Sequence, residues 1–124
     1  MKRYLILCAL LLATTPAWAA GGDATKGQNV FEGAGQCKTC HKPDKNLIGP
    51  ALGGIVGRKA ATYAGFSYSP ALKASGLTWD EATLDKWLAG PAALVSGTRM
   101  VKHVDAAQDR ADIIAYLKTL PPAP

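Results

Sequence analysis

The sequence contains few of the residues that cross-link a small chain or bind metal ions. Of its 124 residues, three are cysteine and two are histidine. One cysteine, Cys8, lies in the hydrophobic N-terminal segment, so only Cys37 and Cys40 remain for the rest of the chain. Two cysteines are too few for a framework of several disulfides. They are also too few for a structural zinc site of the usual kind, which takes four ligands from two such pairs.

The chain also lacks a hydrophobic run long enough to span a membrane. The apolar run of residues 5–12 is shorter than the roughly 20 residues that a transmembrane helix needs. Lys2 and Arg3 precede this run, and Ala17-Trp18-Ala19 follows it. A positive start, a short apolar run and a small-x-small site are typical of a cleaved secretory signal. We therefore predict a signal peptide in residues 1–19, no stable membrane anchor and a periplasmic location.

Long runs of basic residues are absent as well. Removal of Lys2 and Arg3 with the signal lowers the 14 basic residues to 12 against 9 acidic ones, a charge of +3. A modest excess without a basic cluster gives no reason to expect nucleic-acid binding. The remaining residues 20–124 are enough for one small domain, and we expect it to be a monomer.

No segment alternates well enough to predict a strand, whereas helical signals recur. A Ser, Thr or Asp followed by an apolar pattern of helical spacing predicts the start of a helix, and Gly or Pro its end. The sequence therefore predicts an all-α fold of about four helices with long Gly- and Pro-rich loops. The four run from Asp23 to about Ala34, from Ser69 to Gly76, from Thr78 to Gly90, and from Asp105 to Pro121.

The strongest motif is Cys-Lys-Thr-Cys-His at residues 37–41. Cys-x-x-Cys-His is the attachment sequence of a c-type haem: two thiols form thioethers, and the histidine binds the iron. A thioredoxin-like dithiol would follow a strand, but no strand is predicted before Cys37. Together with the export signal, the motif predicts one haem c, bound covalently through Cys37 and Cys40 and ligated by His41.

The candidates for the second iron ligand are Met100, His103, Lys102 or none. Met100 is the only methionine besides the initiator, and it follows a polar loop without core periodicity. A lone methionine is usually a flexible filler of the core, but this context favours a ligand. A thioether raises the haem potential relative to a second imidazole. We predict Met100, with His103 as the main competitor.

With the motif, Met100 and the four helices in place, the chain resembles the class I c-type cytochromes. It is similar to mitochondrial cytochrome c and its short bacterial relatives over nearly all of residues 20–124. The last helix, from Arg110 to Lys118, matches the family closely. The other segments that carry the resemblance are residues 22–31, 48–52, 57–59, 66–68, 76–79 and 97–100.

The resemblance implies roles for further residues. The carbonyl of Pro50 would accept the N–H of His41 and orient the imidazole. Gly27 and Phe31 would cross Ile113 and Tyr116 where the first and last helices meet. The residues implied to contact the haem propionates are Arg58, Tyr68, Trp79 and Thr98.

The sequence departs from the family at four positions around the haem. Trp87 stands where a tyrosine usually lies near the methionine sulfur, and Leu72 where an asparagine is usual. Ser96 replaces a proline of the ligand loop, and Lys102 an aromatic residue. Each change can shift the potential or the strength of the iron–sulfur bond, while the haem and its two ligands are retained.

The favoured function is that of a soluble electron carrier rather than an enzyme. The resemblance implies transient redox partners of a respiratory or photosynthetic chain. The alternatives are a dedicated haem subunit of a periplasmic dehydrogenase, and a haem sensor or peroxidase with an open distal site. Cationic side chains would steer acidic partners to the haem edge. They are Lys38, Lys42, Lys45, Lys86, Arg99 and Lys102.

Overall fold

A computed structural model describes residues 21–124, so the predicted signal segment lies outside the described residues. The helices of this part are α1 (Ala24–Glu32), the 3₁₀ helix η2 (Cys37–Thr39), α2 (Pro70–Ala74), α3 (Glu81–Ala89), α4 (Pro91–Leu94) and α5 (Ala107–Thr119). Residues 21–124 form no strand, and one isolated antiparallel bridge joins Lys59 to Thr78. The predicted all-α fold with four main helices is confirmed. The short helices α4 and η2 are additional.

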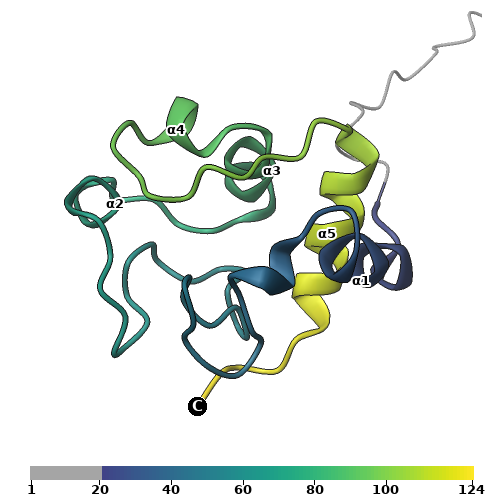
Figure 1. Cartoon of the computed structure of the whole chain (residues 1–124), viewed down its shortest axis with the longest axis horizontal. Coiled ribbons are helices and arrows are strands. Elements are labelled where there is room, and N and C mark those ends of the chain that lie inside the picture. Colours follow the sequence, from purple (N-terminus) through teal and green to yellow (C-terminus); the bar gives the residue numbers. More distant parts are fainter. Residues whose placement is uncertain (1–20) are drawn as a thin grey trace, which may run out of the picture.

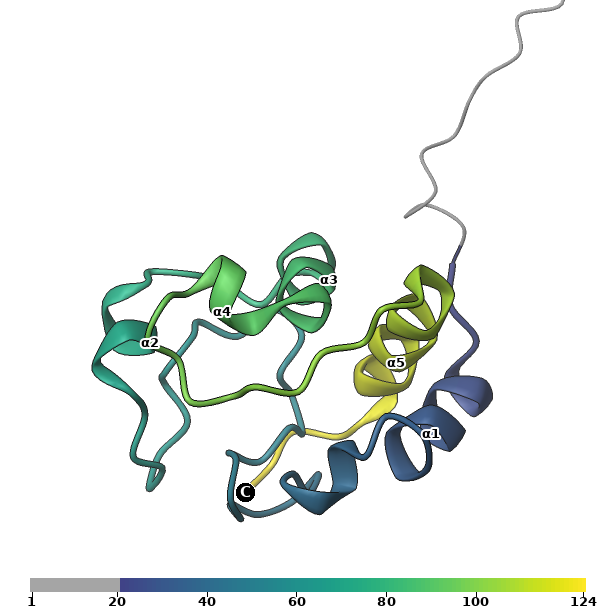
Figure 2. The same ribbon diagram turned by 45° about the horizontal axis from the view of Figure 1, so that its top comes forward.

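The helices α1 and α5 lie against each other at one end of the molecule (Figures 1 and 2). Gly27 permits their close approach, because a Cβ atom at this position would lie 1.8 Å from the carbonyl oxygen of Asp112. One turn further on, the rings of Phe31 and Tyr116 meet edge to face with centroids 5.4 Å apart. The contact predicted for the first and last helices is therefore confirmed. None of the helices in residues 21–124 is long and apolar enough to cross a membrane.

The start of α1 is fixed by two carboxylates. Asp23 caps the helix by accepting the N–H of Lys26 at 2.9 Å, as predicted. Its own N–H donates to the buried carboxylate of Asp112 on α5 at 2.8 Å. The helix ends at Glu32, two residues earlier than predicted, since the backbone of Gly33 leaves the helical region. These bonds tie the first helix to the last at its beginning.

The helix α2 also begins as predicted. The hydroxyl of Ser69 accepts the N–H of Leu72 at 3.1 Å, and Pro70 occupies the first helical position. The helix ends at Ala74, and Gly76 follows with a φ of +66°, a conformation that favours glycine.

Two predicted helix starts are wrong. Asp80 caps α3 by accepting the N–H of Thr83, so Thr78 is not the cap and Trp79 lies before the helix. Thr78 is engaged elsewhere, because it pairs with Lys59 in the β-bridge. Thr78 and Asp80 are both of residue types that commonly cap helices, and the sequence pattern alone does not choose between them.

Asp105 is likewise not the cap of α5, which begins after Ala106 without a side-chain cap. The main-chain carbonyl of Asp105 instead accepts a hydrogen bond from Arg110. Within α5, Ile113, Ile114 and Leu117 are buried as predicted, and Leu120 is half-buried just beyond the helix. The predicted cap is therefore wrong, but the predicted helix is present.

Long loops fill the space between α1 and α2, and the C-terminal tail holds them. Ala123 donates its N–H to the carbonyl of Gly53, and the hydroxyl of Tyr63 donates to the carbonyl of Pro124. The tail runs beside the loops of residues 41–60 in both views (Figures 1 and 2). The C-terminal tail is thus hydrogen-bonded to these loops at two residues, Gly53 and Tyr63.

Candidate functional site

The motif cysteines lie in one tight turn. The turn begins at Gln36, whose φ of 55° lies in the left-handed region that non-glycine residues seldom adopt. Both Cys40 and His41 donate their N–H groups to the carbonyl of Cys37, at 3.1 and 2.9 Å. Cys37 and Cys40 are free thiols that are half-buried, and burial raises the pKa of Cys37. The two sulfurs thus lie on one short segment.

The imidazole of His41 is held by Pro50, as the resemblance implies. Its Nδ1 lies 2.8 Å from the carbonyl oxygen of Pro50. Because a carbonyl only accepts hydrogen bonds, Nδ1 carries the proton and Nε2 keeps its lone pair. Burial lowers the pKa of His41, and this effect outweighs the opposing hydrogen bond to Pro50. The ring is therefore neutral and presents Nε2 as a donor atom.

Two neighbours of Pro50 support this geometry, and the sequence reasoning gave them no role of their own. A Cβ atom on Gly49 would lie 2.2 Å from Cε1 of His41, so only glycine fits beside the ring. Asn46 accepts the N–H of Ala51 at 3.0 Å and so fixes the chain just after Pro50. A glycine before the proline was visible in the sequence, but its contact with the ring depends on the fold.

Met100 lies among side chains that far-apart segments contribute. The indole Nε1–H of Trp87, on α3, donates to the Met100 sulfur at 3.2 Å. The ring of Trp87 meets that of Trp79 at a steep angle, with centroids 5.0 Å apart. Tyr68 and Thr98 line one cavity together with Met100 and Trp87. Leu72 lines the same cavity, so an aliphatic side chain stands at the position where asparagine was noted as usual.

The residues implied to contact the propionates are partly brought together. The guanidinium of Arg58 donates to the carbonyls of Ala51 and Gly53, and the main-chain carbonyl of Arg58 accepts the N–H of Trp79. The hydroxyl of Tyr68 accepts the N–H of Tyr63, whose ring lies under Arg58 with the guanidinium carbon 5.0 Å from its centroid. Burial lowers the pKa of Arg58 and raises that of Tyr68. Arg58, Tyr68 and Trp79 therefore form one neighbourhood, and Thr98 joins Tyr68 at the Met100 cavity.

The six predicted docking cations differ in their surroundings. Lys102 donates to the side chain of Gln36 at 3.4 Å, so it connects the segment after Met100 with the residue before Cys37. Arg99 donates to the carbonyl of Ser67 at 2.8 Å. Lys38, Lys45 and Lys86 are exposed, and Lys42 is half-buried.

The donor set fits a covalently bound haem. Two free thiols lie three positions apart, a neutral imidazole is oriented by a carbonyl, and a thioether lies beside an indole N–H. Thiols form the covalent attachment, and an imidazole with a thioether is the ligand pair of electron-transfer cytochromes. No group of three or more His, Cys, Asp or Glu side chains in residues 21–124 could hold a bare metal ion.

Comparisons with known proteins agree with this chemistry. The family model described as cytochrome c matches residues 24–121. Cytochrome c2 of Rhodomicrobium vannielii is 50% identical over 121 residues, which cover 94% of each chain. Cytochrome c2 of Blastochloris viridis is 40% identical over 120 residues, covering 94% of this chain and 92% of the relative.

Solved structures of similar proteins have the same fold. Cytochrome cH from Methylobacterium extorquens superposes with a TM-score of 0.75 at 49% identity, covering 79% of this chain and 99% of that one. Ferricytochrome c2 from Rhodopseudomonas palustris gives a TM-score of 0.73 at 43% identity, covering 79% and 98%. The chain therefore belongs to the cytochrome c family of electron-transfer proteins, whose haem c is attached covalently at a Cys-x-x-Cys-His sequence, here through Cys37 and Cys40.

Proposed function

We propose that the protein is a soluble periplasmic carrier of single electrons, in which His41 and Met100 would bind the iron of the haem. The haem supplies the redox chemistry by cycling between its ferric and ferrous states. The role of the chain is to keep the same two ligands in both states, to exclude water and to present the haem edge to partners.

The hydrogen bond between His41 and Pro50 carries the proposal. It directs Nε2 toward a ligand and lets the carbonyl share the charge that develops on the ring. Such outer contacts of a ligating histidine fix its orientation and raise its basicity. Because Pro50 lies in a loop tied down by Asn46 and Arg58, the imidazole keeps its position when the iron changes charge.

Met100 is supported as the second ligand by its contacts. Its sulfur accepts a hydrogen bond from Trp87 and lines the cavity that also contains Leu72. The side chain of the competitor His103 is 57% exposed, and its Nε2 lies 3.4 Å from the carboxylate of Asp105. Met100 is therefore favoured over His103.

The surface cations support weak, salt-sensitive docking with acidic redox partners. Lys38 lies within the motif and Lys45 follows it. Both are exposed, as is Lys86 on α3. Their attraction to a partner acts over about 10 Å at ordinary ionic strength, which favours rapid encounter and release. Arg99 and Lys102 have partners within the chain, so we expect them to contribute less to docking.

A redox titration of the purified holoprotein with optical spectra tests the proposal. We expect a sulfur-to-iron charge-transfer band in the ferric protein, absent in Met100→Ala and retained in the matched control His103→Ala. Loss of the band in His103→Ala with retention in Met100→Ala would contradict the ligand assignment. A high-spin ferric spectrum at neutral pH would contradict the closed electron-transfer site and favour an open distal position.

Two further measurements test the proposed export and the proposed monomeric state. The mass of the haem-containing protein from the periplasm should correspond to residues 20–124 plus one haem. Sedimentation should show a monomer. Co-purification with a dehydrogenase in a fixed ratio would instead identify a dedicated haem subunit.

A further inference from the structure

The segment that carries Met100 is poorly supported by its own backbone. We call residues 96–106, between α4 and α5, the ligand loop. In the described part of the chain, residues 99–103 make no main-chain hydrogen bond to other main-chain groups. Val101 is 85% exposed, and Lys102 and His103 are exposed beside it. The position of Met100 therefore depends on side chains that hold the loop from outside.

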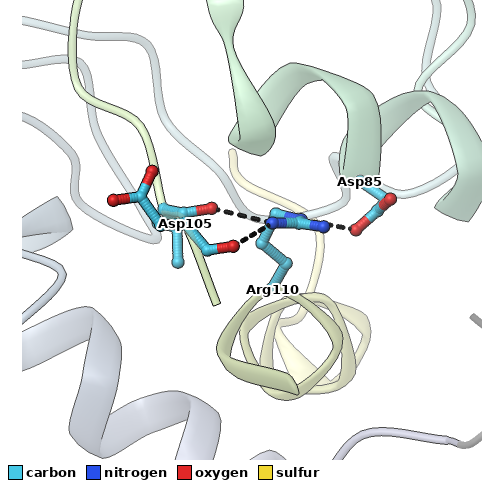
Figure 3. A network of polar contacts seen from close by, with 4 residues as sticks. Asp85, Asp105 and Arg110 are labelled. Atoms are coloured by element: carbon cyan, nitrogen blue, oxygen red, sulfur yellow. Dashed lines mark hydrogen bonds and ion pairs between the residues drawn. The ribbon is translucent and has the colours of Figure 1, made fainter. Parts of the chain in front are cut away.

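One such side chain is Arg110, on the first turns of α5. Its Nη1 donates to the carbonyl oxygens of Val104 and Asp105, at 3.0 and 2.7 Å. Its Nε donates to the carboxylate of Asp85, on α3, at 2.7 Å. Figure 3 shows the guanidinium between the end of the ligand loop and Asp85. A single side chain, 14% exposed, thus links α5, α3 and the ligand loop.

This contact is stronger and more directional than an exposed ion pair. A guanidinium presents its donors in a rigid planar fork, and bonds from a charged donor are about twice as strong as neutral ones. Asp85 fixes the plane of the fork, so the other edge faces the two carbonyls. Next to them, the N–H of Val104 donates to the carbonyl of Leu88 at 2.7 Å. The end of the ligand loop is therefore held against both α3 and α5.

We propose that Arg110 is a positioning residue for Met100. It acts through the carbonyls of Val104 and Asp105, and it limits the loop movements that carry the Met100 sulfur away from the iron. Only three residues separate Met100 from Val104, so a chain of this length can move Met100 no more than about 14 Å from that anchor. The inference rests on the proposed role of Met100 as an axial ligand.

Binding of imidazole to the ferric holoprotein tests the inference, because imidazole occupies the iron only when Met100 has left. In Arg110→Gln the fork is lost, and we expect the affinity for imidazole to rise about tenfold, given the usual strength of charged hydrogen bonds. In Arg110→Lys the positive charge and one donor nitrogen remain, and a smaller rise is expected. Asp85→Asn keeps an acceptor oxygen and should also give an intermediate rise.

Two matched controls separate positioning from general stability. Ile113→Val trims a buried side chain of α5 at the residue whose main-chain nitrogen lies beside Gly27 of α1, and it should lower unfolding stability without changing imidazole affinity. Lys118→Gln removes another α5–α3 ion pair, to Glu81 at 2.7 Å, and should leave imidazole affinity unchanged. If Arg110→Gln binds imidazole like the wild type, or if Ile113→Val raises the affinity as much, the inference is overturned.

The spectrum of the wild-type protein keeps the two proposals distinguishable. Absence of the sulfur-to-iron band in the wild type overturns the ligand role of Met100, and with it this inference. Presence of the band together with an unchanged imidazole affinity in both Arg110 variants overturns the role of Arg110 alone. If Arg110→Gln does not fold, Arg110→Lys and Asp85→Asn carry the same comparison.

Discussion

The crossing of α1 and α5 and the ligand loop are held together in opposite ways. At the crossing, two helices whose backbone bonds are internally satisfied meet so closely that Gly27 has no room for a Cβ atom. In the ligand loop, residues 99–103 make no hydrogen bond from main chain to main chain in the described chain, and side-chain contacts such as those of Trp87 and Arg110 hold the loop. The first region supplies stability, and the second positions Met100, the proposed iron ligand. Substitutions at the crossing should therefore change mainly the free energy of unfolding, whereas substitutions around the ligand loop should change mainly iron ligation.

The largest expected effect belongs to the helix crossing. In Gly27→Ala the added methyl group would meet the Asp112 carbonyl, so α1 and α5 must move apart. We expect the free energy of unfolding in urea to fall by about 3 kcal/mol, at the upper end for overpacking. The sulfur-to-iron band should persist in the protein that remains folded. In the control Gly90→Ala, the new Cβ would lie 3.4 Å from that of Ala93 with an extended φ, and stability should change little.

A smaller effect on stability, with a clear effect on ligation, is expected for Trp87→Phe. The change removes the N–H that draws electron density from the Met100 sulfur, so the sulfur binds ferric iron more strongly. The reduction potential should fall by about 30 mV, a threefold change in the one-electron equilibrium. Unfolding stability should fall by about 1.5 kcal/mol for the lost volume. Leu84→Val, on the same helix, should reduce unfolding stability without changing the reduction potential. An equal fall in potential in Leu84→Val would contradict a specific effect of the Trp87 N–H.

The carboxylate that joins α1 to α5 should make stability depend on pH. The N–H of Asp23, with the amide of Gln108, holds the pKa of Asp112 below its usual value. The resulting stability is complete above the unfolded pKa of about 3.9 and is lost as the pH falls through the lower folded pKa. Asp112→Asn should cost about 1 kcal/mol at pH 7 and progressively less in acid. Urea unfolding across this pH range checks this, and the exposed Asp44→Asn should show neither effect.

The smallest effect should come from the exposed pair of Lys118 and Glu81, whose side chains are 53% and 57% exposed. Lys118→Gln should lower unfolding stability by no more than about 0.5 kcal/mol. The difference should shrink further at high salt, because ions screen exposed charges. A loss as large as that of Gly27→Ala would contradict the view that close packing, rather than surface charge, holds the helices together.

The sequence predicted the helix starts unevenly, and the reason is local. Asp23 and Ser69 were predicted correctly as caps because each lies just before the first helical residue without a competing partner. Thr78 was predicted wrongly because it pairs with Lys59, a residue distant in sequence, while Asp80 caps α3. Asp105 was predicted wrongly, since its carboxylate lies beside His103 and α5 begins after Ala106. Capping patterns are local, whereas their use depends on what the neighbouring segments leave free.

The sequence by itself determined the chemistry of this protein: two thiols and an imidazole in five residues predict covalent haem, and a single methionine outside the signal predicts a thioether ligand. The bond from His41 to Pro50 was implied by the family resemblance, and the structure contains it. Only the tertiary structure decided that Trp87 donates to the Met100 sulfur and that Arg110 holds the ligand loop. These contacts join residues that are 5 to 25 positions apart, and they exist only after packing has brought α3, α5 and the loop together.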